Sequence, residues 1–279
     1  MKVIALSDVE IATQAFGSSD DPALVLVMGA TASMLGWPDE FCAALAGHGL
    51  YVIRFDHRDT GLSTTVQPGE ASYTVEDMAA DVVGVMDGYG LDSAHIMGMS
   101  LGGYISQIVA LTHPDRVRSL ILLASEPLGW DGPALPHITQ DFLDHFGRLA
   151  TLDWSRETEV TDFLLTSERL SAGSGRDVDD VRMRNRIARI LSRTSSPASM
   201  FNHATLDTRR DWTGRYRDIA VPVLVLHGAD DPILPVENGK ALAAGIAGAR
   251  LIVMDGVGHE LPLSEVETIA DLVAGGLRR

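Results

Sequence analysis

The stretch that decides the fold is residues 94–103, Ala94-His95-Ile96-Met97-Gly98-Met99-Ser100-Leu101-Gly102-Gly103. It contains the pentapeptide G-x-S-x-G, centred on Ser100. The apolar run before the serine predicts a short strand, and the apolar spacing from Tyr104 to Val109 predicts a helix after it. A serine on the sharp turn between strand and helix exposes its hydroxyl, and small flanking residues let the two elements approach closely. Ser100 is therefore a candidate nucleophile, and the alternative is that it only caps the helix.

Length and charge restrict the class of protein. The 279 residues are enough to bury one substantial core, and α/β chains of this size commonly form a single domain with at most one insertion. The balance of 22 Lys and Arg against 38 Asp and Glu gives a net charge of -16, which repels phosphate backbones and anionic membranes. Neither nucleic acid nor a membrane is therefore an expected partner.

Cysteine usage and the N-terminal residues add two further expectations. Cys42 is the only cysteine, which excludes an intramolecular disulfide and a cysteine-rich metal site. The first residues contain no long apolar core or cleavage site, and no later apolar run approaches the length of a membrane span. We therefore expect a cytoplasmic protein.

Short apolar runs alternate with helical patterns over most of the chain. Strands are predicted at residues 3–6, 11–16, 23–28, 51–55, 94–97, 117–123, 221–227 and 250–255, and helices at 41–45, 74–90, 104–109 and 236–246. The first two strands are expected to form an antiparallel edge ribbon. The later runs are continuously apolar, which is typical of strands buried on both faces of a parallel sheet. The alternation predicts an α/β fold with a mostly parallel sheet between layers of helices.

Between residues 126 and 213 this alternation stops. The stretch contains no convincing strand, and its apolar positions predict several helices. It holds seven of the eleven Phe and Trp residues, namely Trp130, Phe142, Phe146, Trp154, Phe163, Phe201 and Trp212. We therefore predict a helical cap insertion at residues 126–213, called the cap segment below, between core residues 1–125 and 214–279. Such an insertion could cover Ser100, with its aromatic rings divided between its own core and a pocket wall.

One predicted helix of the cap segment carries an apolar stripe and a basic one. Its apolar positions are Met183, Ile187, Ile190 and Leu191, and its arginines, largely on the other side, are Arg182, Arg186, Arg189 and Arg193. We interpret the arginines as a solvated helix face; the alternative is an anion site. The acidic residues Asp177, Asp179 and Asp180 lie near the start of the helix, where they complement its dipole.

The last two predicted strands are followed by an acidic residue and a histidine. The loop after residues 221–227 contains Asp230 and Asp231, and the glycine-flanked loop after residues 250–255 contains His259. The resulting chain order, Ser then Asp then His, is that of α/β-hydrolase triads. Asp231 precedes Pro232, whose ring favours an extended conformation at the residue before it and so helps to fix the direction of that carboxylate.

A catalytic serine requires both of these partners. Its hydroxyl is a weak nucleophile until a neutral imidazole takes its proton, and a carboxylate holds that imidazole in the right tautomer. Of the nine histidines, only His259 occupies a glycine-flanked loop after the last strand. No H-x-x-x-H pair or Cys/His cluster is present, so a metal site is not expected. For His57 we favour a structural role in the loop that follows residues 51–55, over contact with the oxyanion loop or the substrate.

The chain resembles an α/β-hydrolase over essentially its full length. Within that superfamily it is similar to the aclacinomycin methylesterase group of bacterial serine esterases. The similarity lies in residues 26–29 (LVMG), 35–41 (LGWPDEF) and 56–64 (DHRDTGLST). This resemblance implies Ser100 as nucleophile, Asp231 as acid and His259 as base. It also implies that the backbone N–H groups of Ala30 and Leu101 form the oxyanion hole.

These features together predict a hydrolase that cleaves a carboxylic ester through an acyl-enzyme on Ser100 and needs no cofactor. The expected partner is a small-molecule ester, and a methyl ester of a hydrophobic or aromatic acid is one candidate. Two alternatives stay open: a cofactor-independent C–C bond hydrolase or dioxygenase on the same fold, and a ligand-sensing module with a slow triad. The cap segment shows no diagnostic match, so it leaves the substrate open, and both a monomer and a homodimer are compatible with the sequence.

Overall fold

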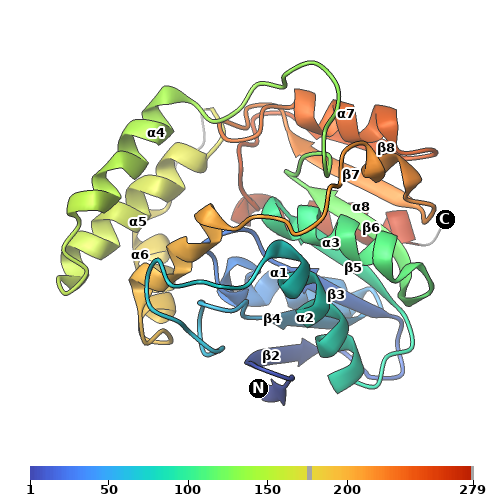
Figure 1. Cartoon of the computed structure of the whole chain (residues 1–279), viewed down its shortest axis with the longest axis horizontal. Helices are drawn as coiled ribbons and strands as arrows, with labels where there is room; N and C mark the ends of the chain where they lie inside the picture. Colours follow the sequence, from blue (N-terminus) through green and yellow to red (C-terminus); the bar gives the residue numbers. More distant parts are fainter. Residues whose placement is uncertain (175–177, 278–279) are drawn as a thin grey trace.

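The computed structural model describes residues 1–174 and 178–277, and within them one eight-stranded sheet forms the centre of the molecule (Figure 1). Its strands are β1 Lys2–Ala5, β2 Glu10–Phe16, β3 Ala23–Val27, β4 Tyr51–Phe55, β5 Ala94–Met99, β6 Val117–Leu123, β7 Val223–Gly228 and β8 Arg250–Met254. Their spatial order is β1-β2-β4-β3-β5-β6-β7-β8. The pairs β1–β2 and β2–β4 are antiparallel, and every other pair is parallel. The predicted mostly parallel sheet with an antiparallel edge ribbon is confirmed.

Helices cover both faces of this sheet. They are α1 Asp39–Gly47, α2 Val75–Gly88, α3 Leu101–Thr112, α7 Glu237–Gly245 and α8 Val266–Leu277. One apolar core lies between the sheet and α2, α3 and α7, and a second lies between the sheet and α1 and α8. All residues of β3 and β7 are buried, as expected for central strands with helices on both sides. Among the described residues, no helix is both long and apolar enough to cross a membrane.

The cap segment folds as helices that lie to one side of the sheet in Figure 1. They are α4 Gln140–Gly147, α5 Glu157–Ser171, α6 Asp180–Leu191 and the 3-10 helix η4 Pro197–Thr205. Further 3-10 turns occur at η1 Met34–Gly36, η2 Pro114–Arg116, η3 Arg148–Thr151, η5 Arg215–Asp218 and η6 Leu263–Glu265. Trp212, near the end of the cap segment, packs in the core on the α2 side, and its Nε1 donates to Glu76 Oε1 at 2.9 Å. No strand occurs in the described part of residues 126–213.

The four arginines assigned to a solvated face are Arg182, Arg186 and Arg189 of α6 and Arg193, two residues beyond its end. Three of them pair with carboxylates of the core: Arg182 with Glu40 at 2.7 Å, Arg189 with Asp39 at 3.4 Å and Arg193 with Asp56 at 2.7 Å. The fourth, Arg186, pairs with Glu168 of α5. The side chains of Arg186 and Arg193 are only 20% and 21% exposed. The interpretation from the sequence holds for Arg182 and Arg189, whose side chains are 46% and 61% exposed. It was wrong for Arg186 and Arg193, because a helical stripe of charge does not reveal which neighbouring element carries its partners.

The acidic residues at the start of α6 behave largely as expected. Asp179 is the N-cap, and its side chain accepts a hydrogen bond from Arg182 N at 3.0 Å. Asp180 forms an ion pair with Arg169 of α5. Asp177 lies outside the described residues.

Candidate active site

Ser100 occupies a sharp turn between β5 and α3. Its backbone dihedrals are φ 52° and ψ -121°, in a region that non-glycine residues rarely adopt. Two hydrogen bonds hold the turn: Ser100 N donates to Leu123 O at 2.9 Å, and Ser125 Oγ donates to Ser100 O at 2.9 Å. The ends of β5 and β6 therefore fix the strained residue that the sequence motif predicts.

The glycines around Ser100 allow strand and helix to touch. A Cβ atom on Gly98 would lie 2.2 Å from Gly102 O, and one on Gly102 would lie 2.1 Å from Val27 O. Both distances are far below van der Waals contact, so a side chain at either position would push the segments apart. The steric reason inferred for the motif is therefore present in the structure.

The loop after β3, residues 28–31, runs beside the serine. β3 and β5 are parallel neighbours with Val27 opposite Gly98, and Ala30 and Leu101 each follow three residues later. A Cβ on Gly29 would lie 3.2 Å from Ser100 Cβ, which shows how close the loop comes. Within the described residues, the backbone N–H groups of Ala30 and Leu101 donate no hydrogen bond. Both N–H groups are thus available near the serine.

Asp231 and His259 lie together after β7 and β8. His259 Nδ1 is 2.8 Å from Asp231 Oδ2, while Oδ1 of the same carboxylate accepts hydrogen bonds from Ile233 N and Leu234 N at 2.9 and 2.8 Å. Burial alone would raise the pKa of Asp231, but attraction to His259 and these hydrogen bonds outweigh it and lower the pKa below the usual 3.8. The carboxylate is therefore ionised beside the imidazole.

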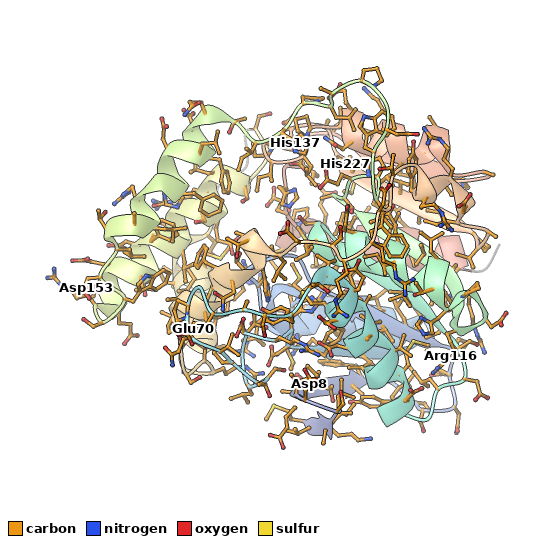
Figure 2. The ribbon with its side chains drawn as sticks, in the orientation of Figure 1. Asp8, Glu70, Arg116, His137, Asp153 and His227 are labelled. Atoms are coloured by element: carbon orange, nitrogen blue, oxygen red, sulfur yellow. The ribbon has the colours of Figure 1, made fainter. Side chains whose placement is uncertain are left out.

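A second histidine, His227, contacts the same carboxylate. It is fully buried at the end of β7, where its Nε2 donates to Leu234 O at 2.6 Å and lies 3.5 Å from Asp231 Oδ2. Figure 2 labels His227 together with His137, which lies in the loop that leads to α4. That loop is joined to the acid loop by a hydrogen bond from Thr139 N to Pro232 O at 2.9 Å. No sequence pattern indicates His227, because its contact with Asp231 forms only in the fold.

Asp230 points away from the imidazole. Its Oδ2 accepts hydrogen bonds from the backbone N of Ser174, at 3.0 Å, and from the Ser174 hydroxyl, at the end of α5. The two adjacent aspartates therefore have different partners: Asp231 contacts His259, and Asp230 contacts the cap segment.

A cavity of about 810 Å³ lies between the catalytic loops and the cap segment. Ser100, His259 and Ala30 lie at its core end. Its apolar wall includes Phe142, Phe146, Leu149, Leu164, Met183, Ile187, Ile190, Met200 and Phe201. Charged side chains, Glu168, Asp179, Arg182, Arg186 and Glu260, line other parts of the wall. Three of the aromatic rings of the cap segment therefore face this space, whereas Phe163 stacks on His145 within the cap segment.

The sequence profile of the alpha/beta hydrolase fold matches residues 22–266. The chain belongs to this family. It is 31% identical to rhodomycin D methylesterase DnrP of Streptomyces peucetius, over 99% of this chain and 98% of that protein. It is 32% identical to a pimeloyl-[acyl-carrier protein] methyl ester esterase of Neisseria meningitidis, over 66% of this chain and 70% of that protein. Among solved structures, the esterase EaEST from Exiguobacterium antarcticum aligns over 99% of both chains, with a TM-score of 0.79 and 20% identity.

These similarities bear on three expectations from the sequence. The α/β-hydrolase fold and the resemblance to the methylesterase group are confirmed. The enzyme class, an ester hydrolase, is confirmed by the family and by the methylesterase relatives. The roles of individual residues rest on the geometry described above.

In this alpha/beta hydrolase, His57 belongs to a buried network beneath the active site. Its Nε2 donates to Met28 O at 2.9 Å, at the start of the loop that carries Ala30. The next residue, Arg58, pairs with Asp81 at 2.6 Å and with Asp8 at 2.9 Å. His57 is absent from the cavity wall as described, but it does contact the loop at residues 28–31, which is one of the two contacts that the sequence analysis disfavoured. Complete burial lowers the pKa of His57 to about 3.

The two adjacent aspartates predict unequal effects of mutation. Asp231→Asn is expected to lower kcat at least about a hundredfold, because an amide favours the wrong imidazole tautomer; a serine protease loses about 10⁴ in this way. Asp230→Asn removes only a contact with Ser174 and should stay within about tenfold, which is near 1.4 kcal/mol of barrier. Both kcat values are measured on one activated ester. The reverse ranking would assign the acid to Asp230, and two near-normal enzymes would mean that neither aspartate orients His259.

The buried His57 predicts a pH-dependent stability. Below about pH 6.5 the unfolded chain protonates this histidine, whereas the folded protein does so only near pH 3. Between these two pH values, protonation of this one histidine in the unfolded chain lowers the free energy of unfolding by about 1.4 kcal/mol for each pH unit that the pH falls. His57→Gln cannot take up this proton, so urea unfolding between pH 7 and pH 5 should show a shallower loss of stability than in the wild type. The matched change His113→Gln, at an exposed position, should keep the wild-type slope. Equal slopes for the wild type and His57→Gln would contradict the buried neutral state.

Proposed function

We propose that this protein is a serine esterase that cleaves a carboxylic ester through an acyl-enzyme on Ser100, with His259 as general base and Asp231 as the acid of the triad. One observation carries the proposal: His259, which is 2.8 Å from the buried Asp231, lines the same cavity as a serine held on a strained strand-to-helix turn. These are the groups that nucleophilic acyl transfer requires, and they follow the chain order of α/β-hydrolases.

In the proposed reaction, Ser100 Oγ attacks the ester carbonyl carbon and its proton passes to Nε2 of His259. Asp231 stabilises the imidazolium through the hydrogen bond to Nδ1. The bond to the alcohol then breaks, and the alcohol leaves with the proton from His259. A water molecule attacks the acyl group after giving a proton to His259, which returns it to Ser100 Oγ as the acid is released.

The developing oxyanion would be bound by the N–H groups of Ala30 and Leu101. Support comes from their equivalent places after two neighbouring parallel strands and from the close approach of Gly29 to the serine. Donors fixed in advance need no rearrangement as negative charge develops, and one such donor is worth about 10²–10³ in kcat.

For the substrate, we propose a methyl ester of a bulky apolar acid. The cavity of about 810 Å³ is large enough for a drug-sized molecule, and three phenylalanines and several aliphatic side chains form its wall. The full-length similarity to an enzyme named as a rhodomycin D methylesterase supports a methyl ester as the bond that is cleaved.

Ser100→Ala tests the chemistry. The change removes one hydroxyl and the covalent step, so hydrolysis of p-nitrophenyl acetate should vanish while the circular dichroism spectrum stays unchanged. The wild type should release one equivalent of nitrophenol in a rapid burst, and a serine-directed phosphonate should add a single label at Ser100. Full activity of the variant, or a label on another residue, would contradict the assignment of Ser100 as the nucleophile. Tight ligand binding without turnover on any ester would instead favour a sensing module.

The cavity predicts a preference for large acyl groups. kcat/KM for methyl 2-naphthoate should exceed that for methyl acetate at least about a hundredfold, because burial of an aromatic ring contributes several kcal/mol at about 25 cal/mol per Å². Phe146→Ala should lower kcat/KM for the naphthoate and leave that for the acetate nearly unchanged. Equal kcat/KM values for the two esters in the wild type would refute the apolar acyl site while leaving the serine chemistry in place.

A further inference from the structure

Two buried histidines hold the loop that carries Ala30, and one of them comes from the cap segment. We infer that His203 is a positioning residue, which fixes residues 28–31 so that Ala30 N–H can bind the oxyanion. This inference rests on the serine esterase mechanism proposed above. By this inference the cap segment positions a group of the catalytic site in addition to covering that site.

The contacts of His203 define its tautomer. Its Nδ1 accepts a hydrogen bond from Thr31 N at 3.1 Å, and its Nε2 donates to Arg58 O at 2.8 Å. The ring is only 4% exposed. Burial lowers the pKa of His203, so the imidazole stays neutral and keeps its acceptor lone pair on Nδ1.

The bond matters because Thr31 is strained. Its φ of 61° lies in the left-handed region, which is costly for a β-branched residue and persists only where surrounding contacts enforce it. At the other end of the loop, His57 Nε2 donates to Met28 O at 2.9 Å. Ala30 lies between these two fixed points, so the direction of its N–H depends on both. Loss of the His203 bond would let Thr31 relax and turn the Ala30 N–H away from Ser100.

The helix that carries His203 is anchored by other contacts. In η4, Asn202 Nδ2 donates to Asp59 Oδ2 at 2.8 Å, and Asn202 Oδ1 accepts from Gly69 N at 2.7 Å. Ser199 Oγ donates to Val66 O at 2.7 Å. A substitution at position 203 therefore leaves η4 attached to the core, and its effect on the loop can be measured by itself.

Two variants of His203 test the hydrogen-bond acceptor for Thr31 N–H separately from side-chain shape, because Asn and Leu have nearly the same shape. In His203→Asn, the side-chain oxygen takes the place of Nδ1 as acceptor. In His203→Leu, the side chain has no acceptor. Both variants lose the same contact with Arg58. We expect kcat of the Leu variant to be at least tenfold below that of the Asn variant, with KM values within threefold. Inhibition by a trifluoromethyl ketone, whose adduct carries the oxyanion, should weaken in proportion to the loss in kcat/KM.

His145→Leu is the control for removing a buried histidine from the cap segment. His145 is also 4% exposed, and it bonds Ser167 Oγ at 2.9 Å without touching the loop at residues 28–31. This variant should keep a kcat near the wild-type value. Equal kcat values for His203→Asn and His203→Leu, or a loss confined to KM, would overturn the inference.

Failure of the esterase mechanism would look different. In that case the wild type itself would form no ketone adduct at Ser100, whereas failure of this inference alone leaves the wild-type adduct intact. If His203→Leu does not fold, ¹⁵N NMR of the histidines in the wild type decides the question. The inference requires His203 to be protonated at Nε2 and unprotonated at Nδ1, and the opposite tautomer would refute it.

Discussion

The close approach of three backbone segments at Ser100 is the constraint on which the rest of the site depends. β5, the start of α3 and the loop after β3 meet with no room for side chains at Gly98 and Gly102, and with little at Gly29. Because they meet so tightly, the serine takes up a strained conformation and the N–H groups of Ala30 and Leu101 come to the same edge of the sheet. The sheet supplies the rigidity that holds this strain, since β3, β5 and β6 are almost entirely buried between two layers of helices.

Hydrogen bonds join the cap segment to the catalytic loops at several points in the described residues. At the end of α5, Ser171 O accepts a hydrogen bond from His259 N at 2.8 Å, and Gly173 N donates to Glu260 Oε1 at 2.9 Å. In η4, His203 reaches the loop beside Ser100. These bonds, together with the ion pairs of α6, connect the apolar wall of the cavity to the groups that are proposed to react. Packing of the cap segment and geometry of the active site are therefore coupled.

The sequence predicted the features that depend on local pattern. Continuous apolar runs identify buried strands, a glycine-framed serine identifies the turn, and Pro232 favoured Asp231, the carboxylate that does contact His259. Helix α8 was missed although its apolar residues recur at helical spacing. The partners of the α6 arginines and the contacts of His203 and His227 could not be predicted, because each joins residues brought together only by the fold. A lone histidine carries no sequence signal that distinguishes a positioning role from simple burial.

A crystal structure of the enzyme inhibited by an aryl phosphonate is the decisive measurement, since it displays the nucleophile, the oxyanion donors and the acyl site together. The proposed mechanism predicts a covalent bond from phosphorus to Ser100 Oγ, with the phosphoryl oxygen about 2.7–3.1 Å from both Ala30 N and Leu101 N. The aryl group should lie against Phe142, Phe146 and neighbouring residues of the cap segment. A phosphoryl oxygen turned away from both N–H groups, or phosphorus bound to another residue, would contradict it.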